Sequence, residues 1–223
     1  MRNCAGRQPS EISQSRCRNS AYLSNSDLLH WDMLEAELLL NAYRSGIFPM
    51  AVGHRRDIAW FSPDPRAIIP LDHRFHVTHG LRRVWKRGEF AVTFDTDFES
   101  VIRECAKRKE GTWISSEIAD SYCELHRLGH AHSLETRFEG KLVGGLYGVH
   151  IGAAFFGESM FHRTTDASKV ALVALVDRLR ANGFVLLDTQ WQTPHLRQFG
   201  TYEIPRREYL QRLARAIAFD CKF

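Results

Sequence analysis

The chain has 223 residues, of which 44 % are hydrophobic and 25 % charged, a balance typical of folded globular proteins that excludes disorder throughout. Its formal net charge of +4 is too small an excess to identify a partner, so the basic residues have to be interpreted by position. No apolar run approaches the roughly 20 residues that a membrane-spanning helix needs, and the first thirty residues lack the apolar stretch of roughly 7 to 15 residues that a signal peptide contains. We therefore expect a cytoplasmic protein without a membrane partner.

The first segment of the chain is polar. Residues 1–27 are rich in Ser, Asn and Arg and are expected to form a disordered tail, because they bury too little apolar surface to offset their ordering entropy. A helix is then expected to begin with Asp32 as its N-cap, to place Leu34 and Leu38 on one face, and to end at Gly46.

The helix is followed by shorter elements. We expect a loop, a short strand at 58–61, a turn at 62–65 that contains two prolines, and an apolar segment at 67–71. Residues 28–75 are therefore interpreted as a small N-terminal lobe.

The remaining residues, 76–223, show a clearer alternation of helical and strand patterns. The expected order is one strand, two helices, three antiparallel strands, a helix, a strand, a helix and a strand. The strands are expected at 90–94, 132–138, 141–149, 153–157, 184–188 and 202–204, and the long helix between Asp166 and Asn182. This order resembles the GNAT-type N-acetyltransferases. We thus expect an α+β chain, with a small N-terminal lobe and an acetyltransferase-like C-terminal domain whose sheet is mostly antiparallel.

An apolar, glycine-spaced pair of strands leads to Glu158, which has aromatic residues and Met close by in the sequence. The strand period predicts that Phe155 and Phe156 lie on opposite faces, and that Gly157 leaves room for a ligand or a backbone beside Glu158. Two interpretations stay open: a pocket wall with a single charge, or a buried hairpin whose acid forms a structural cap or ion pair.

Asp188 and Gln190 lie two residues apart at the end of a buried strand. They share a face if the strand continues, and the strand ends of α/β sheets are where ligands usually bind. The alternative is that Asp188 hydrogen-bonds the turn that follows it. A pairing of Asp188 with Glu158 would be harder to explain as turn chemistry.

Basic residues form two clusters, each of which could be a solvated helix face or a phosphate-binding surface. The first cluster surrounds Trp85, and the second lies near the C-terminus. Their members are Arg82, Arg83, Lys86 and Arg87, and Arg206, Arg207, Arg212 and Arg215.

Cysteines and glycines bear on cofactors. The five cysteines are scattered without a CxxC pair, which indicates reduced thiols and no structural metal. The expected loop at 158–166 contains no glycine, so it lacks the N–H nest that would bind the pyrophosphate of coenzyme A. A coenzyme A-dependent N-acetyltransferase stays an alternative because of the strand order, and a non-catalytic RNA-binding module is a second alternative.

Nine segments between Leu38 and Leu210 carry a more specific resemblance. They are GIFPM (46–50), WFSPDPR (60–66), GTWI (111–114), LGHAHSLE (128–135), LVGGLYGV (142–149), FFGESMF (155–161), ASK (167–169), LLDTQ (186–190) and EIPRREYL (203–210). With these segments the chain resembles the leucyl/phenylalanyl-tRNA-protein transferases. The resemblance implies transfer of Leu, Phe or less readily Met from aminoacyl-tRNA to proteins that begin with Arg or Lys, which marks them for degradation.

The resemblance also implies roles for the acidic site. Asp188 and Gln190 match residues that orient the attacking amine and help to deprotonate it, and Glu158 matches a further site residue. Gln190 cannot act as a base, so its role would be positioning. Which carboxylate takes the proton, or whether a ribose hydroxyl relays it, stays open. Because an aminoacyl ester is already activated, no cofactor or metal is expected.

Other matched positions concern the donor. Five apolar residues match the walls of the pocket for the transferred amino acid, although without the resemblance they would be interpreted as core: Leu146, Phe155, Met160, Leu175 and Leu187. Trp113 matches the aromatic residue that stacks on the terminal adenosine of tRNA, with a core Trp as the alternative. Arg82, Arg83, Lys86 and Arg87 match the basic helix that binds the tRNA acceptor stem, and we expect a monomer.

Two departures from the family pattern concern the N-terminal region. The family usually has GIFPW where this chain has Met50, and its usual Gly-Gly-Asp-Leu segment is replaced by 26–30. We therefore expect a smaller or rearranged first lobe.

Overall fold

The computed structural model describes residues 34–107 and 111–223, so the predicted tail and the Asp32 cap lie outside the described residues. In chain order the elements are α2 (Ala36–Arg44), β1 (Phe48–Val52), β2 (Asp57–Phe61), β3 (Arg66–Ile69), α3 (His79–Arg87), β4 (Ala91–Phe94), α4 (Phe98–Ala106), α5 (Ser116–Arg127), β5 (Ala131–Phe138), β6 (Lys141–Ile151), β7 (Ala154–His162), α6 (Ala167–Ala181), β8 (Leu186–Gln190), α7 (Pro194–Arg197), β9 (Tyr202–Ile204) and α8 (Arg206–Ala216).

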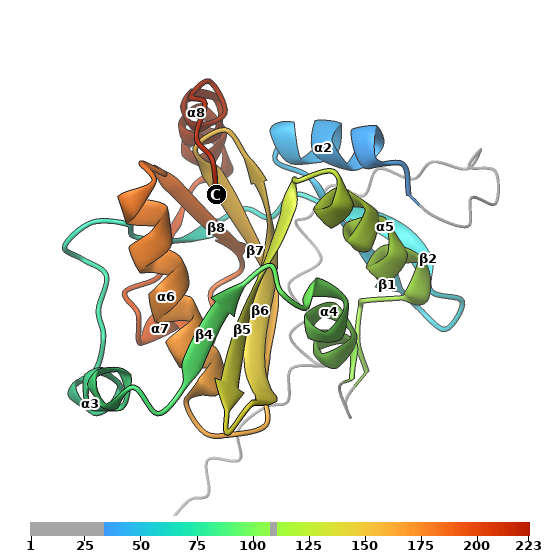
Figure 1. Cartoon of the computed structure of the whole chain (residues 1–223). Helices are drawn as coiled ribbons and strands as arrows, with labels where there is room; N and C mark the ends of the chain where they lie inside the picture. Colours follow the sequence, from blue (N-terminus) through green and yellow to red (C-terminus); the bar gives the residue numbers. More distant parts are fainter. Residues whose placement is uncertain (1–33, 108–110) are drawn as a thin grey trace, which may run out of the picture.

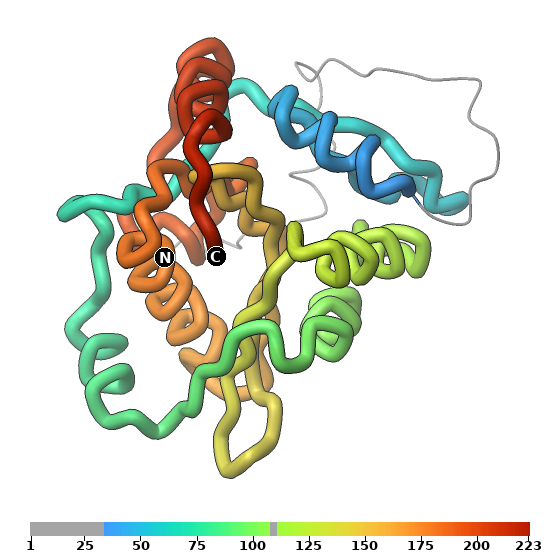
Figure 2. Tube along the Cα trace, turned by 45° about the horizontal axis from the view of Figure 1, so that its top comes forward, coloured from blue at the N-terminus to red at the C-terminus, as the bar shows by residue number. Residues whose placement is uncertain are grey.

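A seven-stranded sheet with the order β4-β5-β6-β7-β8-β3-β9 forms the centre of the molecule. Every neighbouring pair is antiparallel except β7 and β8, which are parallel. Helices α6 and α3 lie on one side of this sheet and α4 and α5 on the other (Figures 1 and 2). The predicted α+β class with a mostly antiparallel sheet is confirmed, and the elements from β4 to β9 follow the predicted order.

The strand period divides the apolar side chains between the two faces of the sheet. Phe155 belongs to the core cluster beneath α6, whereas Phe156 belongs to the cluster on the side of α4 and α5. The prediction that these two rings point in opposite directions is confirmed. Helix α6 packs so closely on β6 that a Cβ added at Gly144 would lie 2.5 Å from the Cβ of Ala167.

The first helix differs from the prediction. Leu38 is 45 % exposed, whereas Leu39, Leu40 and Tyr43 form the buried face of α2, so the predicted shared face of Leu34 and Leu38 is wrong. The reason is that Leu34 precedes the helix, where its N–H donates to Ser121 Oγ over 2.8 Å. The predicted end of the helix is confirmed.

The segment after this helix is more ordered than expected. Strand β1 occupies part of the predicted loop and pairs along its whole length with β2, from Phe48–Phe61 to Val52–Asp57. The next strand, β3, lies between β8 and β9 in the large sheet. The expected small lobe, residues 28–75, therefore includes β3, although this strand is an inner strand of the large sheet.

Two later strands extend beyond their predicted ends. β7 continues to His162, so residues 158–162 are not part of a loop as predicted, because β6 keeps pairing with them as far as Gly144–His162. β8 runs to Gln190 instead of ending at Asp188. Asp166 occupies the N-cap position of α6, but its side chain accepts a hydrogen bond from Lys169 Nζ over 2.7 Å and does not cap the helix N–H groups.

Candidate active site

The parallel strands β7 and β8 are paired over only three residues each. Their last pair is Phe156 with Asp188. Beyond it β7 stays with β6, while β8 stays with β3, where Ala67 pairs with Gln190. We call the point where these strands separate the β7–β8 fork, consisting of Gly157 and Glu158 on β7 and Thr189 and Gln190 on β8. Such a point within a sheet gives a ligand access to the strand ends.

A β-bulge places Glu158 at this fork. Gly148 pairs with Gly157 and Tyr147 pairs with Ser159, so Glu158 is an extra residue on β7. A bulge turns the side chain of the extra residue away from the regular alternation. The predicted space beside Glu158 is present, since a Cβ at Gly157 would meet only the Asp188 carbonyl oxygen, at 3.5 Å.

Asp188 is fully buried and bound by a buried arginine. Arg66 Nε donates to Oδ1 over 2.9 Å, and a terminal nitrogen of Arg66 donates to Oδ2 over 2.5 Å. The Tyr209 hydroxyl donates to Oδ2 over 2.9 Å. The local hydrogen bond that the structural alternative predicted is also present, because the Gln190 N–H donates to Oδ1 over 2.9 Å. Asp188 thus connects β3, α8 and the end of its own strand.

The Arg66 guanidinium lies between aromatic rings, 4.9 Å from the ring centre of Phe48 and 4.5 Å from that of Tyr209. Burial opposes the charge of Arg66, yet the adjacent Asp188 carboxylate raises the pKa of the guanidinium above its ordinary value. A buried arginine with a bidentate carboxylate partner is a fixed ion pair.

Glu158 binds neutral groups. Gln190 Nε2 donates to Oε1 over 3.3 Å, and the Tyr122 hydroxyl makes a long hydrogen bond of 3.5 Å to Oε2. The Tyr122 hydroxyl is itself hydrogen-bonded to that of Tyr43. Gln190 therefore bridges the fork from β8 to the bulge on β7.

The pKa of the Glu158 carboxyl is raised from 4.5 to about 8, mainly by burial and in addition by the negative charge of Asp188, while Tyr43, Arg66 and Tyr122 act in the opposite direction. Burial, with the charge of Glu158 nearby, also raises the pKa values of Tyr43 and Tyr122, so both hydroxyls keep their protons. A large share of Glu158 is consequently protonated at neutral pH.

The structure brings the five predicted pocket residues together in one apolar cluster beneath α6. Leu146, Phe155, Leu175 and Leu187 are at most 3 % exposed, and Met160 is partly buried beside them. This cluster lies on the opposite face of the sheet from Asp188. Such burial is also what core residues would show, so the role in a pocket stays a prediction.

Trp113 lies in the loop before α5, away from the pocket cluster. It is partly buried against the other core cluster, and its carbonyl oxygen accepts a hydrogen bond from the Ala51 N–H over 3.1 Å. The loop thereby supports the hairpin of β1 and β2.

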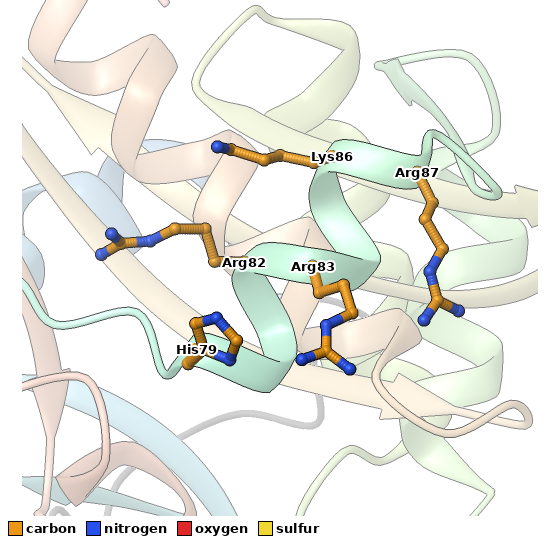
Figure 3. Close-up of a pocket in the computed structure, with 5 residues that line it drawn as sticks. All are labelled: His79, Arg82, Arg83, Lys86 and Arg87. Carbon is orange, nitrogen blue, oxygen red and sulfur yellow. The ribbon is translucent and has the colours of Figure 1, made fainter.

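All four residues of the first basic cluster lie on α3 and are exposed. Together with His79 they line a shallow hollow of about 260 Å³. Arg82 and Lys86 project to one side of the helix, and Arg83 and Arg87 to the other (Figure 3). The cluster is on the α6 side of the sheet, whereas the Glu158 carboxyl faces α5, so the sheet separates the two.

Four residues that bind or lie next to the carboxyl groups of Asp188 and Glu158 were not identified from the sequence. They are Arg66, Tyr209, Tyr43 and Tyr122. Arg66 ends the quoted segment 60–66, but nothing in the local sequence shows that its partner lies 122 positions away. The ring of Tyr122 belongs to the buried face of α5, while its hydroxyl contacts Glu158.

The described residues, 34–107 and 111–223, bear on two general possibilities, a metal site and a membrane-spanning helix. No group of three His, Cys, Asp or Glu side chains in these ranges is arranged to hold a metal ion. None of the helices in the same ranges is long and apolar enough to cross a membrane.

The chain matches known families along almost all of its described length. A model of the leucyl/phenylalanyl-tRNA protein transferase family matches residues 68–214, and a model of the N-terminal domain of the same family matches residues 32–64. Relatives named leucyl/phenylalanyl-tRNA–protein transferase include one from Akkermansia muciniphila, 54 % identical over 83 % of this chain and 97 % of the relative. Another, from Gloeobacter violaceus, is 55 % identical over 85 % of this chain and 97 % of its own.

Solved structures give weaker similarities. A ribosomal-protein-alanine N-acetyltransferase from Brucella melitensis has a TM-score of 0.36 at 16 % identity, covering 49 % of this chain and 85 % of its own. An aminoglycoside acetyltransferase from a soil metagenome has a TM-score of 0.37 at 15 % identity, covering 47 % of this chain and 79 % of its own. These TM-scores are too low to add to the argument.

Proposed function

Because the chain belongs to the leucyl/phenylalanyl-tRNA protein transferase family, we propose that it transfers Leu or Phe, and less readily Met, to proteins whose first residue is Arg or Lys. Transfer of an aminoacyl group from tRNA to a protein is the activity of this aminoacyltransferase family. The product would carry a new N-terminal residue that acts as a degradation signal. We further propose that the protein is a cytoplasmic monomer.

The reaction joins an ester donor to an amine acceptor. The ester that links an amino acid to tRNA is already activated, so the enzyme mainly has to align the amine with the carbonyl carbon and accept a proton. We propose that this happens at the β7–β8 fork, with Gln190 positioning the amine beside the carboxyl groups of Asp188 and Glu158. In its ionised form Glu158 would favour a cationic chain terminus and an Arg or Lys side chain.

The donor side chain would occupy the apolar cluster of Leu146, Phe155, Met160, Leu175 and Leu187. Rings and unbranched chains suit both Leu and Phe, and a charged donor would be rejected by its desolvation cost. One methylene group in such a pocket is worth only about 1–3 kcal/mol, so the exclusion of other apolar donors would be moderate.

The tRNA would bind through its backbone. Arg82, Arg83, Lys86 and Arg87 on α3 form an exposed cationic surface, and Trp113 would stack on the terminal adenosine. Recognition would therefore depend on the shape and charge of the acceptor stem more than on its base sequence.

The observation that carries the proposal is the pairing of carboxylates and amide at the fork: Gln190 is bonded to Asp188 through its backbone and to Glu158 through its side chain. To test it, the purified protein is incubated at low salt with radiolabelled Leu-tRNA and proteins that differ only in their first residue. We expect label on proteins that begin with Arg or Lys, and much less on those that begin with Asp or Glu. Absence of transfer to every acceptor would contradict the proposal.

A further inference from the structure

The hydrogen bonds of Asp188 limit what this residue can do. A carboxylate offers about four lone-pair positions. Arg66 and the Gln190 N–H bind Oδ1, while Arg66 and Tyr209 bind Oδ2. All four positions are thus in use, and both Asp188 and Arg66 are at most 1 % exposed.

Protonation of Asp188 would be costly for a second reason. A proton on either oxygen would displace one of these donors and leave the Arg66 cation buried without its counter-ion. Removing one partner of a buried ion pair is strongly unfavourable, because the remaining charge is uncompensated. Asp188 is therefore poorly suited to receive a proton during the reaction.

Glu158 differs from Asp188 in each of these respects. Its donors are neutral, Gln190 Nε2 and the Tyr122 hydroxyl, and their distances of 3.3 and 3.5 Å are long. No hydrogen bond to Glu158 comes from Arg66 among the described contacts. The bulge on β7 places it where the paired strands separate, and Gly157 beside it leaves open space.

We propose that Arg66 is a positioning residue that keeps Asp188 as a permanent carboxylate, and that Glu158 is the catalytic residue that accepts the proton of the attacking amine. This inference rests on the proposed function and specifies its mechanism. Asp188 then acts through others: it holds the backbone of Gln190, whose side chain in turn orients Glu158.

The proposed step conserves atoms and charge. The nitrogen of the neutral acceptor amine forms a bond with the ester carbonyl carbon of the aminoacyl-tRNA, and one proton of that nitrogen passes to the Glu158 carboxylate. The bond from the carbonyl carbon to the ribose oxygen then breaks. The ribose oxygen leaves with the proton that Glu158 returns, so the products are an amide and a free hydroxyl, and Glu158 is again ionised.

The ionisation of Glu158 fits this role. Burial raises its pKa to about 8, close to the 7.7 to 8.0 that is ordinary for an α-amino group. Proton transfer is most effective between groups of similar pKa near the working pH. The titratable and charged groups that face Glu158 are Tyr43 on α2, Tyr122 on α5, Asp188 on β8 and Arg66 on β3, and both tyrosines stay neutral in this range.

The test is the pH dependence of kcat/KM for an acceptor peptide that begins with Arg, at saturating Leu-tRNA. Under these conditions the parameter reports ionisations of the enzyme–Leu-tRNA complex and of the free peptide. In the wild type both the neutral amine and ionised Glu158 are needed, so log kcat/KM should rise with a slope approaching two below pH 7. In Glu158→Gln only the amine ionises, so the slope should fall to one and kcat should fall by about 10²- to 10⁴-fold.

Two further variants separate Glu158 from its neighbours. Asp188→Asn should lower kcat and keep a slope of two, but this slope should be reached at lower pH, because the charge of Asp188 raises the pKa of Glu158. Arg66→Lys should recover more activity than Arg66→Ala, because it retains the positive charge. Unchanged Leu-tRNA binding and circular dichroism would show that Glu158→Gln is folded. The inference is overturned if Glu158→Gln keeps the slope of two, or if Asp188→Asn reduces the slope to one at every pH below 7. Lack of transfer by the wild type would instead overturn the proposed function.

Discussion

Glu158 is a residue whose charge opposes folding. Its pKa is about 8 in the folded chain and 4.5 ordinarily, so between these values the folded state binds more protons than the unfolded state. Stability therefore decreases as the pH rises through this window, and the loss is complete above about pH 8. This is the reverse of the usual behaviour of a salt-bridged carboxylate.

Substitution of Glu158 by Gln should remove this pH dependence. We expect the Tm of Glu158→Gln to exceed that of the wild type, with a difference that is small at pH 5 and grows up to pH 8.5. Differential scanning fluorimetry across this range checks the expectation, with Glu37→Gln at an exposed position as the control, whose curve should run parallel to the wild type. A constant difference at all pH values would show that burial does not raise the pKa of Glu158.

Asp188→Ala should be among the most destabilising single substitutions in the chain. It leaves the Arg66 guanidinium buried without its partner, for which the cost is about 3–5 kcal/mol. Urea denaturation measures the loss. The matched control is Asp72→Ala, which breaks the exposed pair with Arg74 and should have little effect. Equal losses in both variants would contradict a fixed ion pair at Asp188.

For single residues, the sequence predicted only part of the candidate site. The grouping of Asp188, Gln190 and Glu158 followed from a strand period and a family resemblance. The binding of Asp188 by Arg66 did not, because it depends on β3 pairing with β8 across 122 positions of the chain. Local patterns contain no information about which distant strand becomes a neighbour.

Individual elements were predictable where their apolar pattern was strong. α4 and α5 are the two helices expected after the first strand of the C-terminal domain, whereas β1 was missed because it is short and contains Pro49. The second half of β7 was missed as well, since Glu158 and His162 interrupt its apolar run. The extended conformation of both segments is stabilised by backbone hydrogen bonds to a neighbouring strand, β2 for β1 and β6 for β7.

The contact of α6 with β6 should be sensitive to a single methyl group. A Cβ at Gly144 would lie 2.5 Å from the Cβ of Ala167 and 3.0 Å from its carbonyl carbon, so Gly144→Ala must displace the start of the helix. We expect a loss of about 1–3 kcal/mol in the free energy of unfolding, measured in urea.

The control for this substitution is Gly80→Ala in α3. A Cβ at Gly80 would meet nothing within 4 Å, so this change should be neutral or stabilise by up to about 1 kcal/mol. If Gly144→Ala were as stable as Gly80→Ala, the close packing of α6 on β6 would be refuted.

For the whole molecule, the arrangement of charge leads to a prediction about tRNA. Arg82→Gln and Lys86→Gln should each weaken tRNA binding and reduce the slope of log K against log salt by about 0.7–0.9. Fluorescence anisotropy measures both effects at salt concentrations from about 50 to about 200 mM, the range in which phosphate contacts respond strongly. Arg215→Gln on α8 is the comparison: a loss as large as those on α3 would mean that binding does not depend on the α3 surface.

The place of β3 has a consequence for dividing the chain. The two family models leave only residues 65–67 between them, which suggests a natural cutting point. Yet Arg66–Ile69 joins β8 to β9 and carries the counter-ion of Asp188. A truncated protein that starts at residue 76 would have a gap in its sheet and an orphaned acid at its centre. The shortest working fragment must therefore begin upstream of Arg66, and the first lobe cannot be exchanged as an independent module at residue 75.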